Sequence, residues 1–210
     1  NDGCVSENFR KNMAFECFSK ISSYDELISE WFVSNKIRYG ENPHQSAEYV
    51  GNLEKYFYKI QGKDLSYNNL LDIDAAFNLI YEFDDPTFAI FKHTNPCGVA
   101  SGREEDKLND IWNEALKGDP LSAFGGIIIS NREIDEETAK SISEIFFEVL
   151  IAPSYTSEAL NLFQNTTKKI LLRSTNGNLR TEDRKSILGG ILKQNRDNIV
   201  GGSSYNFEVV

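Results

Sequence analysis

Two adjacent side chains that can take part in proton transfer, Lys92 and His93, end a short apolar run in the middle of the chain. Phe88–Phe91 is rich in β-forming residues, so the sequence predicts a buried strand there. Asn95-Pro96 and Gly98 then predict a turn, because proline fixes its own φ and biases the preceding residue away from helix. An ammonium and an imidazole at such a strand end can move a proton and stabilise charge. Taken alone, the pattern favours a simpler interpretation, a surface lysine and a histidine bonded to the turn.

A second group of chemically capable residues lies in Arg38–Gln45, which reads Arg-Tyr-Gly-Glu-Asn-Pro-His-Gln. Arg38 can hold a phosphate through two parallel N–H donors, and the Tyr39 hydroxyl can add a third. His44, the only other histidine, lies in the same stretch beside an Asn-Pro pair. The segment has no clear periodicity, so we expect a loop. Composition alone favours a solvated surface turn over a ligand loop.

The elements before Phe88 are predicted to be mostly helical. Apolar residues four apart in residues 7–21 predict one helix, and Ser23 with Glu26 fits the capping box of a second. We expect a structural helical pair. Residues 59–64 are a polar bend, and Ser66–Asn69 supplies N-cap candidates for a helix through about Phe83. A spare asparagine carboxamide at that helix start could also reach a ligand.

From Phe88 onwards strands and helices alternate. The expected strands after the first are residues 127–129, 149–152 and 170–172, and the expected helices are 104–116, 135–145 and 157–163. Fully apolar strands in this order predict an α/β fold with a mainly parallel sheet and helices on both faces. Further along, residues 176–185 are expected to be an exposed connector, and residues 187–192 and 206–210 to be strands.

Composition narrows the functional classes. The net charge of −10 argues against a non-specific nucleic-acid binder, which needs a basic surface. No apolar run is long enough to cross a membrane, and no signal peptide opens the chain. Three widely spaced cysteines suggest reduced thiols, so we expect a cytoplasmic protein that binds neither nucleic acid nor membrane.

Several catalytic signatures can be set aside. Pro96-Cys97 after His93 suggests a zinc deaminase, but Asn95 replaces the required glutamate and Ala100 the second cysteine, so no zinc is expected. The sequence contains no Rossmann fingerprint, no Walker loop and no nucleophile elbow. Cys97 as a nucleophile is conceivable beside His93, yet a small turn residue explains it better.

Five ordered motifs carry a resemblance that covers nearly the whole chain: Arg38–Gln45, Leu65-Ser-Tyr-Asn-Asn69, Lys92-His-Thr-Asn-Pro-Cys-Gly98, Ser122-Ala-Phe-Gly-Gly126 and Ile151-Ala-Pro153. They resemble the bifunctional purine-biosynthesis enzymes that join AICAR formyltransferase to IMP cyclohydrolase. The resemblance implies a cytidine-deaminase-like α/β fold without zinc. It divides the chain into a helical linker segment, residues 1–36, and the first half of the formyltransferase region, residues 37–210. The cyclohydrolase domain and the second transferase half are then absent.

The resemblance also implies roles for individual residues. Lys92 and His93 match the catalytic pair that passes a formyl group from 10-formyltetrahydrofolate, the co-substrate, to the exocyclic amine of AICAR. The matched substrate-binding residues are Arg38 and Tyr39 for the phosphate, and Asn69, Gly125 and Glu148 for the rest of the nucleotide. Leu121 and Phe124 match the folate-binding stretch, and His44 receives a supporting role. Glu148 is expected at the start of a strand, away from the carboxyl strand ends where ligands usually bind.

The resemblance implies a homodimer for the full-length enzyme, with AICAR and folate as its small-molecule partners. Because the family's site also draws on the second transferase half, we expect the chain alone not to turn over. The alternative is a non-catalytic α/β domain that binds a nucleotide or serves as an assembly surface.

Overall fold

The computed structural model describes residues 5–164, 166, 168–175 and 181–197, which fall into two units within Asn1–Asn176 and Gly177–Val210. The elements of the first unit are α1 (Glu7–Val33), β1 (Ser34–Lys36), β2 (Glu48–Val50), a 3-10 turn (Leu53–Lys55), β3 (Phe57–Gln61), α2 (Tyr67–Ile80), β4 (Thr87–Lys92), β5 (Asn95–Ser101), α3 (Leu108–Leu116), α4 (Pro120–Ala123), β6 (Ile127–Ser130), α5 (Glu136–Ser143), β7 (Val149–Ala152), α6 (Ser157–Phe163) and β8 (Ile170–Ser174). Among the described helices, none combines the length and the apolar character that a membrane crossing requires.

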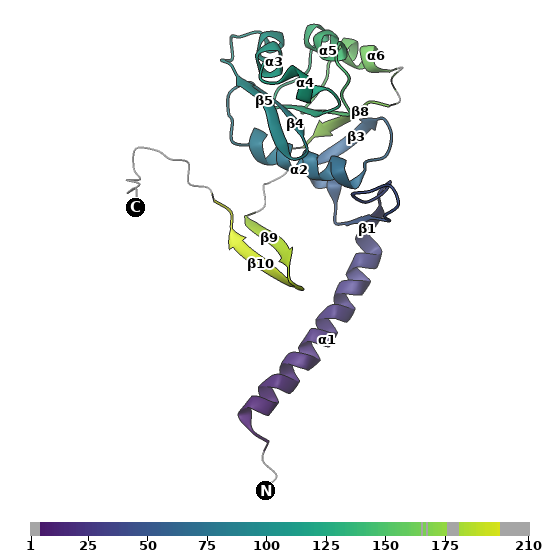
Figure 1. Cartoon of the computed structure of the whole chain (residues 1–210), viewed down its shortest axis with the longest axis vertical. Helices are drawn as coiled ribbons and strands as arrows, with labels where there is room; N and C mark the ends of the chain where they lie inside the picture. Colours follow the sequence, from purple (N-terminus) through teal and green to yellow (C-terminus); the bar gives the residue numbers. More distant parts are fainter. Residues whose placement is uncertain (1–4, 165, 167, 176–180, 198–210) are drawn as a thin grey trace, which may run out of the picture. The chain divides into compact units, whose positions relative to one another are not determined.

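A six-stranded sheet organises the first unit (Figure 1). Its strand order is β3-β8-β7-β6-β4-β5. The α/β prediction is confirmed, and β7 and α6 have the predicted bounds. The parallel part of the sheet is the run β6-β7-β8, whereas β3, β4 and β5 pair with their neighbours in antiparallel fashion. The predicted polar bend at residues 59–64 begins later than expected, because β3 extends to Gln61.

The direction of β4 follows from a tight hairpin. The predicted turn at Asn95–Gly98 is wrong, because these residues open β5 and the chain reverses at His93-Thr94 instead. Both turn residues have positive φ, 53° and 62°, as two-residue hairpin loops of this twist require. β5 brings the chain back beside the start of β4. α3 and α4 then lead it to the opposite side of the sheet, beside the end of β4. β6 therefore enters beside β4 in the opposite direction, with Phe91 opposite Ile127.

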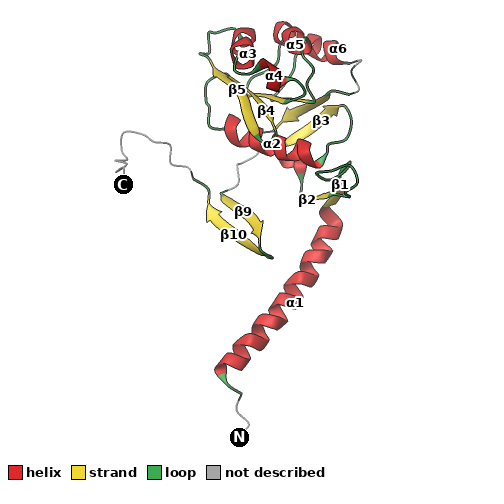
Figure 2. Ribbon diagram, viewed as in Figure 1, coloured by secondary structure: helices red, strands yellow, loops and turns green. Residues whose placement is uncertain are grey.

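Helices cover both faces of the sheet, as predicted (Figure 2). Alternate β4 residues point to opposite faces, so Phe88 and Ile90 pack with α3, α5 and α6, while Ala89 and Phe91 pack with α2. β6 and β7 are buried along their whole lengths. This double burial explains their continuous apolar sequences and fixes the strand ends firmly in space.

The predicted N-terminal helical pair is instead one helix, α1, capped by Ser6, whose hydroxyl accepts a hydrogen bond from Phe9 N–H at 3.3 Å. Ser23 lies inside it and starts no second helix, because nothing around it breaks the backbone pattern. None of the α1 residues is buried, and Phe9, Met13 and Ile21 are exposed.

The described part of the second unit is a hairpin of β9 (Glu182–Ile187) and β10 (Gly190–Asn195). The prediction of one strand over residues 187–192 is wrong, because Leu188 and Gly189 have φ of 49° and 74° and turn the chain. β9 also occupies part of the predicted connector. The strand expected at residues 206–210 lies outside the described residues.

Candidate functional site

Lys92 and His93 lie where predicted, at the end of a buried strand. Lys92 is the last residue of β4, and its Nζ donates a hydrogen bond to the Phe124 carbonyl at 2.9 Å. His93 and Thr94 occupy the left-handed region, which for non-glycine residues costs about 1–3 kcal/mol each. Such strain gathers at functional sites, because it persists only where surrounding structure enforces it.

The hairpin around this pair carries a bulge. Ile90 lies opposite Gly98 and Phe91 opposite Pro96, so Cys97 is the extra residue on β5. Its thiol donates to the Ile90 carbonyl at 3.4 Å, and burial raises its pKa. A raised pKa disfavours the thiolate, which agrees with the expectation that Cys97 is not a nucleophile.

A pocket of about 290 Å³ opens beside the pair, lined by Lys92, His93, Asn95, Pro96, Cys97, Asp119 and Ser122. The Asp119 carboxylate accepts hydrogen bonds from the Ser122 N–H at 3.0 Å and hydroxyl at 2.6 Å, capping α4. These bonds lower the pKa of Asp119, and the Lys92 ammonium lowers it further. The pocket therefore combines a cation, an imidazole and a carboxylate that stays ionised.

The segment after α4 presents apolar groups next to Lys92. Leu121 is 89% exposed and Phe124 is 59% exposed, and the Phe124 ring lies 5.4 Å from that of Phe146. Gly125 follows with φ of 77°, and its N–H donates to the Phe146 carbonyl at 2.7 Å. Exposed aromatic and leucine side chains beside a polar pocket suit the flat ring of an aromatic ligand.

Asn69 and Glu148 meet although they are 79 positions apart. Asn69 is 5% exposed, and its Oδ1 accepts a hydrogen bond from Ser66 N–H at 3.1 Å in the capping box of α2. Its Nδ2 donates to Glu148 Oε2 at 2.9 Å, and Lys63 Nζ lies 3.9 Å from the same oxygen. The asparagine is thus both the expected cap and a residue that orients a half-exposed carboxylate.

The antiparallel direction of β4 places Glu148 near the pair. The end of β4 lies beside the starts of β6 and β7. Lys92, Gly126 and Glu148 therefore lie at one edge of the sheet, meaning here the side formed by strand ends and not an outer strand. The Glu148 N–H donates to the Gly126 carbonyl at 3.0 Å. The expectation that the start of a strand lies away from the site assumed that β4 runs parallel to β6, and that assumption is wrong.

The Arg38–Gln45 loop is attached to the start of α2. Arg38 N–H donates to the Leu65 carbonyl, and Tyr67 N–H donates to the Tyr39 carbonyl, both at 3.2 Å. Arg38 Nη2 donates to the Tyr39 hydroxyl at 2.8 Å, so the two side chains act as one group. His44 is exposed, and among the described residues no hydrogen bond, ion pair or ring contact joins it to the other candidates.

Sequence reasoning missed three residues at this edge. Asp72 accepts a hydrogen bond from Thr94 N–H at 2.6 Å, Asp119 lines the pocket, and Lys63 approaches Glu148. Asp72 could have been found from spacing, because it follows Asn69 by three positions and so shares its helix face. The described residues contain no group of three or more His, Cys, Asp or Glu that could hold a metal ion.

Comparisons with known proteins identify the family of the chain. A family model described as AICARFT/IMPCHase bienzyme matches residues 1–210. The bifunctional purine biosynthesis protein PurH of Bacteroides thetaiotaomicron is 44% identical over 201 residues, covering 90% of this chain and 39% of that protein. The PurH proteins of Lactococcus lactis subsp. cremoris and of a Chelativorans species are 37% and 40% identical, covering 95% and 94% of the chain.

The chain spans about two fifths of the length of these relatives, namely 39%, 43% and 42%. The match is continuous over the sheet, the Lys92-His93 hairpin and the α2 segment alike. The chain therefore belongs to the AICARFT/IMPCHase bienzyme family.

Proposed function

We propose that this chain supplies part of the active site that transfers a formyl group from 10-formyltetrahydrofolate to the amine of AICAR, a step of IMP synthesis. The observation that carries the proposal is the meeting of three segments at one sheet edge. These are the Lys92-His93 hairpin, the Phe124-Gly125 turn and the Asn69–Glu148 pair. Membership of the bienzyme family supports it.

His93 is the proposed general base. The AICAR amine is a weak nucleophile, because its lone pair is delocalised into the ring. A base that removes its proton as the nitrogen attacks the formyl carbon lowers the barrier. No hydrogen bond occupies the His93 imidazole among the described residues, so it is free to accept that proton.

Lys92 is the proposed electrostatic partner of His93. Its ammonium can stabilise the negative charge that develops on the formyl oxygen when the amine attacks the formyl carbon, or donate a proton to the folate nitrogen that leaves. The Phe124 carbonyl holds Nζ at 2.9 Å and thereby directs the charge to the folate-binding stretch of Leu121 and Phe124.

The nucleotide is proposed to lie across α2. Arg38 and Tyr39 bind its phosphate, while Asn69, Gly125 and Glu148 contact the remainder, with Glu148 accepting from a ribose hydroxyl. Asn69 fixes one oxygen of Glu148, which leaves the other for a ligand. We assign His44 only a supporting role in the loop.

The site is proposed to be completed by sequence outside this chain. The complete polypeptide that carries the chain is proposed to act as a cytoplasmic homodimer, and residues 1–36 to link its two activities. Leu121 and Phe124, which are largely exposed here, would then be covered by the second half of the transferase.

The test of nucleotide binding is calorimetric titration of the complete polypeptide with AICAR ribonucleotide and with the nucleoside that lacks phosphate. Arg38→Lys should weaken ribonucleotide binding about tenfold, because one ammonium cannot replace the bidentate guanidinium. The nucleoside should bind both proteins equally. A matched control is Arg10→Lys, on the exposed helix α1. Equal losses for both ligands in Arg38→Lys would show that Arg38 is structural.

The alternative, a non-catalytic nucleotide-binding or assembly domain, is separated by a rate measurement. If the complete polypeptide formylates AICAR and the His93→Ala variant binds AICAR but does not turn over, the catalytic proposal holds. If both proteins turn over equally, His93 is not the base, and the non-catalytic alternative is favoured.

A further inference from the structure

The position of the His93-Thr94 turn depends on more than its own sequence. Neither residue is a glycine, yet both have positive φ, and Thr94 is β-branched, which makes this conformation especially unfavourable. Two-residue turns of this type favour Asn-Gly, since those residues adopt positive φ readily. A His-Thr turn therefore needs a contact from elsewhere in the fold to hold it.

Two of the bonds at the turn are local. Thr94 Oγ1 donates to the His93 carbonyl at 2.7 Å, and Asn95 Nδ2 donates to the same oxygen at 2.8 Å. Both bonds join residues within the turn, so they shape it without fixing where it lies relative to the helices.

A third bond reaches across the fold. Asp72 Oδ1, on α2, accepts a hydrogen bond from Thr94 N–H at 2.6 Å. A charged acceptor makes this bond short and strong compared with a bond between neutral groups. Among the described residues, this is the hydrogen bond that ties the backbone of the turn to another element. α2 is itself fixed, because Ile73 and Phe77 are buried against the sheet.

We propose that Asp72 is a positioning residue that holds the His93-Thr94 turn, and with it the His93 imidazole, in its reactive place. The inference rests on the proposed function, in which His93 takes the proton from AICAR. Asn69, one helical turn before Asp72, orients Glu148 on the nucleotide side. One rigid helix thus sets the position of the base through Asp72 and that of the nucleotide carboxylate through Asn69. The distance between base and substrate is then determined by a single element.

The test uses the complete polypeptide with Asp72→Ala and Asp72→Asn, and Asp74→Ala as the matched control. Asp74 lies on the same helix, is exposed, and accepts a bond from Asn78 Nδ2 at 3.2 Å. Asp72→Ala should lower kcat by roughly ten- to a hundredfold, since a displacement of about 1 Å at a reacting group has effects of that size. KM for AICAR should stay within about twofold. Asp72→Asn keeps an acceptor oxygen and should recover part of the loss.

Hydrogen exchange of the peptide containing Thr94 provides a readout that does not depend on catalysis. Asp72→Ala should speed exchange at this amide about tenfold or more, because the bond that protects it is lost. The control should exchange as the parent protein does. A thermal melt of each variant shows whether it is folded, and Asp72→Asn keeps the test decisive if the alanine variant is not.

The outcomes separate the two proposals. Unchanged exchange at Thr94, or a kcat for Asp72→Ala that equals the control, overturns the role of Asp72. Full activity of His93→Ala overturns the proposed function instead, and faster exchange in Asp72→Ala would then still establish the anchor.

Discussion

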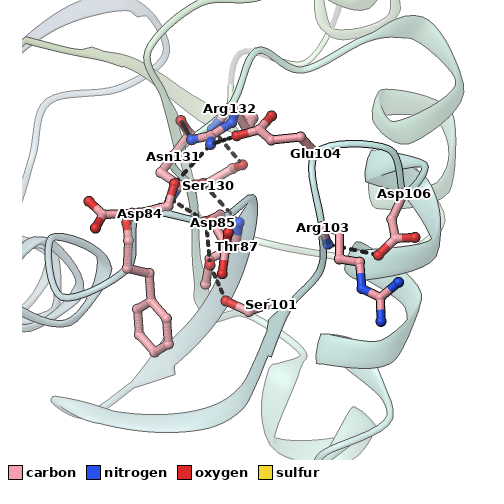
Figure 3. A network of polar contacts seen from close by, with 11 residues as sticks. Asp84, Asp85, Thr87, Ser101, Arg103, Glu104, Asp106, Ser130, Asn131 and Arg132 are labelled. Atoms are coloured by element: carbon pink, nitrogen blue, oxygen red, sulfur yellow. Dashed lines mark hydrogen bonds and ion pairs between the residues drawn. The ribbon is translucent and has the colours of Figure 1, made fainter. Parts of the chain in front are cut away.

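The two edges of the central sheet are built differently. At one edge, where β4 ends and β6 and β7 begin, the backbone is strained and the His93 imidazole is unpaired among the described residues. At the other edge, polar side chains bind backbone groups and close the loops (Figure 3). The Asn131 side chain alone accepts from Thr87 N–H at 2.8 Å and donates to the carbonyls of Phe83 and Asp85 at 3.1 and 2.8 Å.

Arg132 extends this closed network. Its Nη2 donates to the Asp84 carbonyl at 2.8 Å and pairs with Glu104. A hollow of about 210 Å³ remains nearby, lined by Phe77, Ile80, Tyr81, Phe83, Asp84, Ile129, Ser130, Asn131, Pro153, Ser174 and Thr175. The polar groups of the network are already used by the protein.

The proposed site departs from a general rule about such folds. Ligands of open α/β sheets usually bind beyond the carboxyl ends of parallel strands. In this chain the carboxyl ends of β6, β7 and β8 lie on the network side, and the hairpin carries the reactive pair to the opposite edge. One edge provides stability, and the other is available for chemistry.

The largest effect is expected at the strained edge. His93→Ala in the complete polypeptide should lower kcat by about a hundredfold to ten-thousandfold, the usual cost of losing a positioned base. AICAR binding, measured by calorimetry, should change little, and so should the melting temperature. A loss of kcat below about tenfold in steady-state kinetics would remove His93 from the role of base.

At the closed edge, Asn131→Ala should act on stability and not on rate. It removes three hydrogen bonds and leaves the N–H of Thr87, a buried residue, without its acceptor, which should cost about 2–4 kcal/mol. Urea unfolding measures this loss. Asn131→Asp, which keeps the acceptor for Thr87, should lose less. A large fall in kcat in folded Asn131→Ala would contradict the claim that this edge contributes to stability and not to the reaction.

Tyr155 provides a second test of stability near the closed edge. Its hydroxyl lies 2.9 Å from the Leu150 carbonyl and 2.8 Å from that of Leu172, bridging β7 and β8. Tyr155→Phe should lower the free energy of unfolding by about 1–2 kcal/mol at pH 8. The expected activity at that pH is unchanged.

The same side chain should give an alkaline signature. Burial raises the pKa of the Tyr155 hydroxyl well above 10.0. The unfolded chain releases this proton as pH passes about 10, while the folded chain keeps it. The stability that the protonated hydroxyl provides is therefore complete below pH 10 and declines above it. Unfolding measured across this range should show a smaller decline in Tyr155→Phe, and equal declines would show that another group titrates.

The smallest expected effect is a gain in stability. Thr94→Gly relieves the positive φ of a β-branched residue and should stabilise the fold by up to about 1 kcal/mol. The freer turn should also lower kcat by roughly twofold to tenfold. Thermal unfolding and kinetics of one preparation test both statements. Lower stability together with higher kcat would mean that the turn carries no functional strain.

Sequence reasoning succeeded where local interactions determine the structure and failed where contacts between distant residues do. Val149–Ala152 and Ser157–Phe163 were predicted with their observed bounds, because burial on both faces and a Thr156 cap leave clear local signals. Asn95-Pro96 was assigned to a turn on equally clear local chemistry, and that was wrong. The real turn, His93-Thr94, is held in part by Asp72, 22 positions away, and such a contact has no local signature.

The candidate site showed the same limit. The family resemblance named Asn69 and Glu148, and the structure brings them into contact. The assignments of function to these residues stay predictions, as do the proposed boundary after residue 36 and the supporting role of His44. Pocket residues such as Asp119 were not named, because their relevance depends on how α4 approaches the end of β4.

The bulged hairpin limits how this part of the chain can vary. Lys92 pairs with Asn95 across a two-residue turn, Cys97 is the one extra residue, and a Cβ on Gly98 would lie 1.9 Å from the Ala115 carbonyl of α3. Adding or removing one residue between Lys92 and Gly98 would shift the following β5 residues by one position against β4 and turn their side chains to the opposite face of the sheet. Homologous chains should therefore differ here in residue type but keep a constant number of residues.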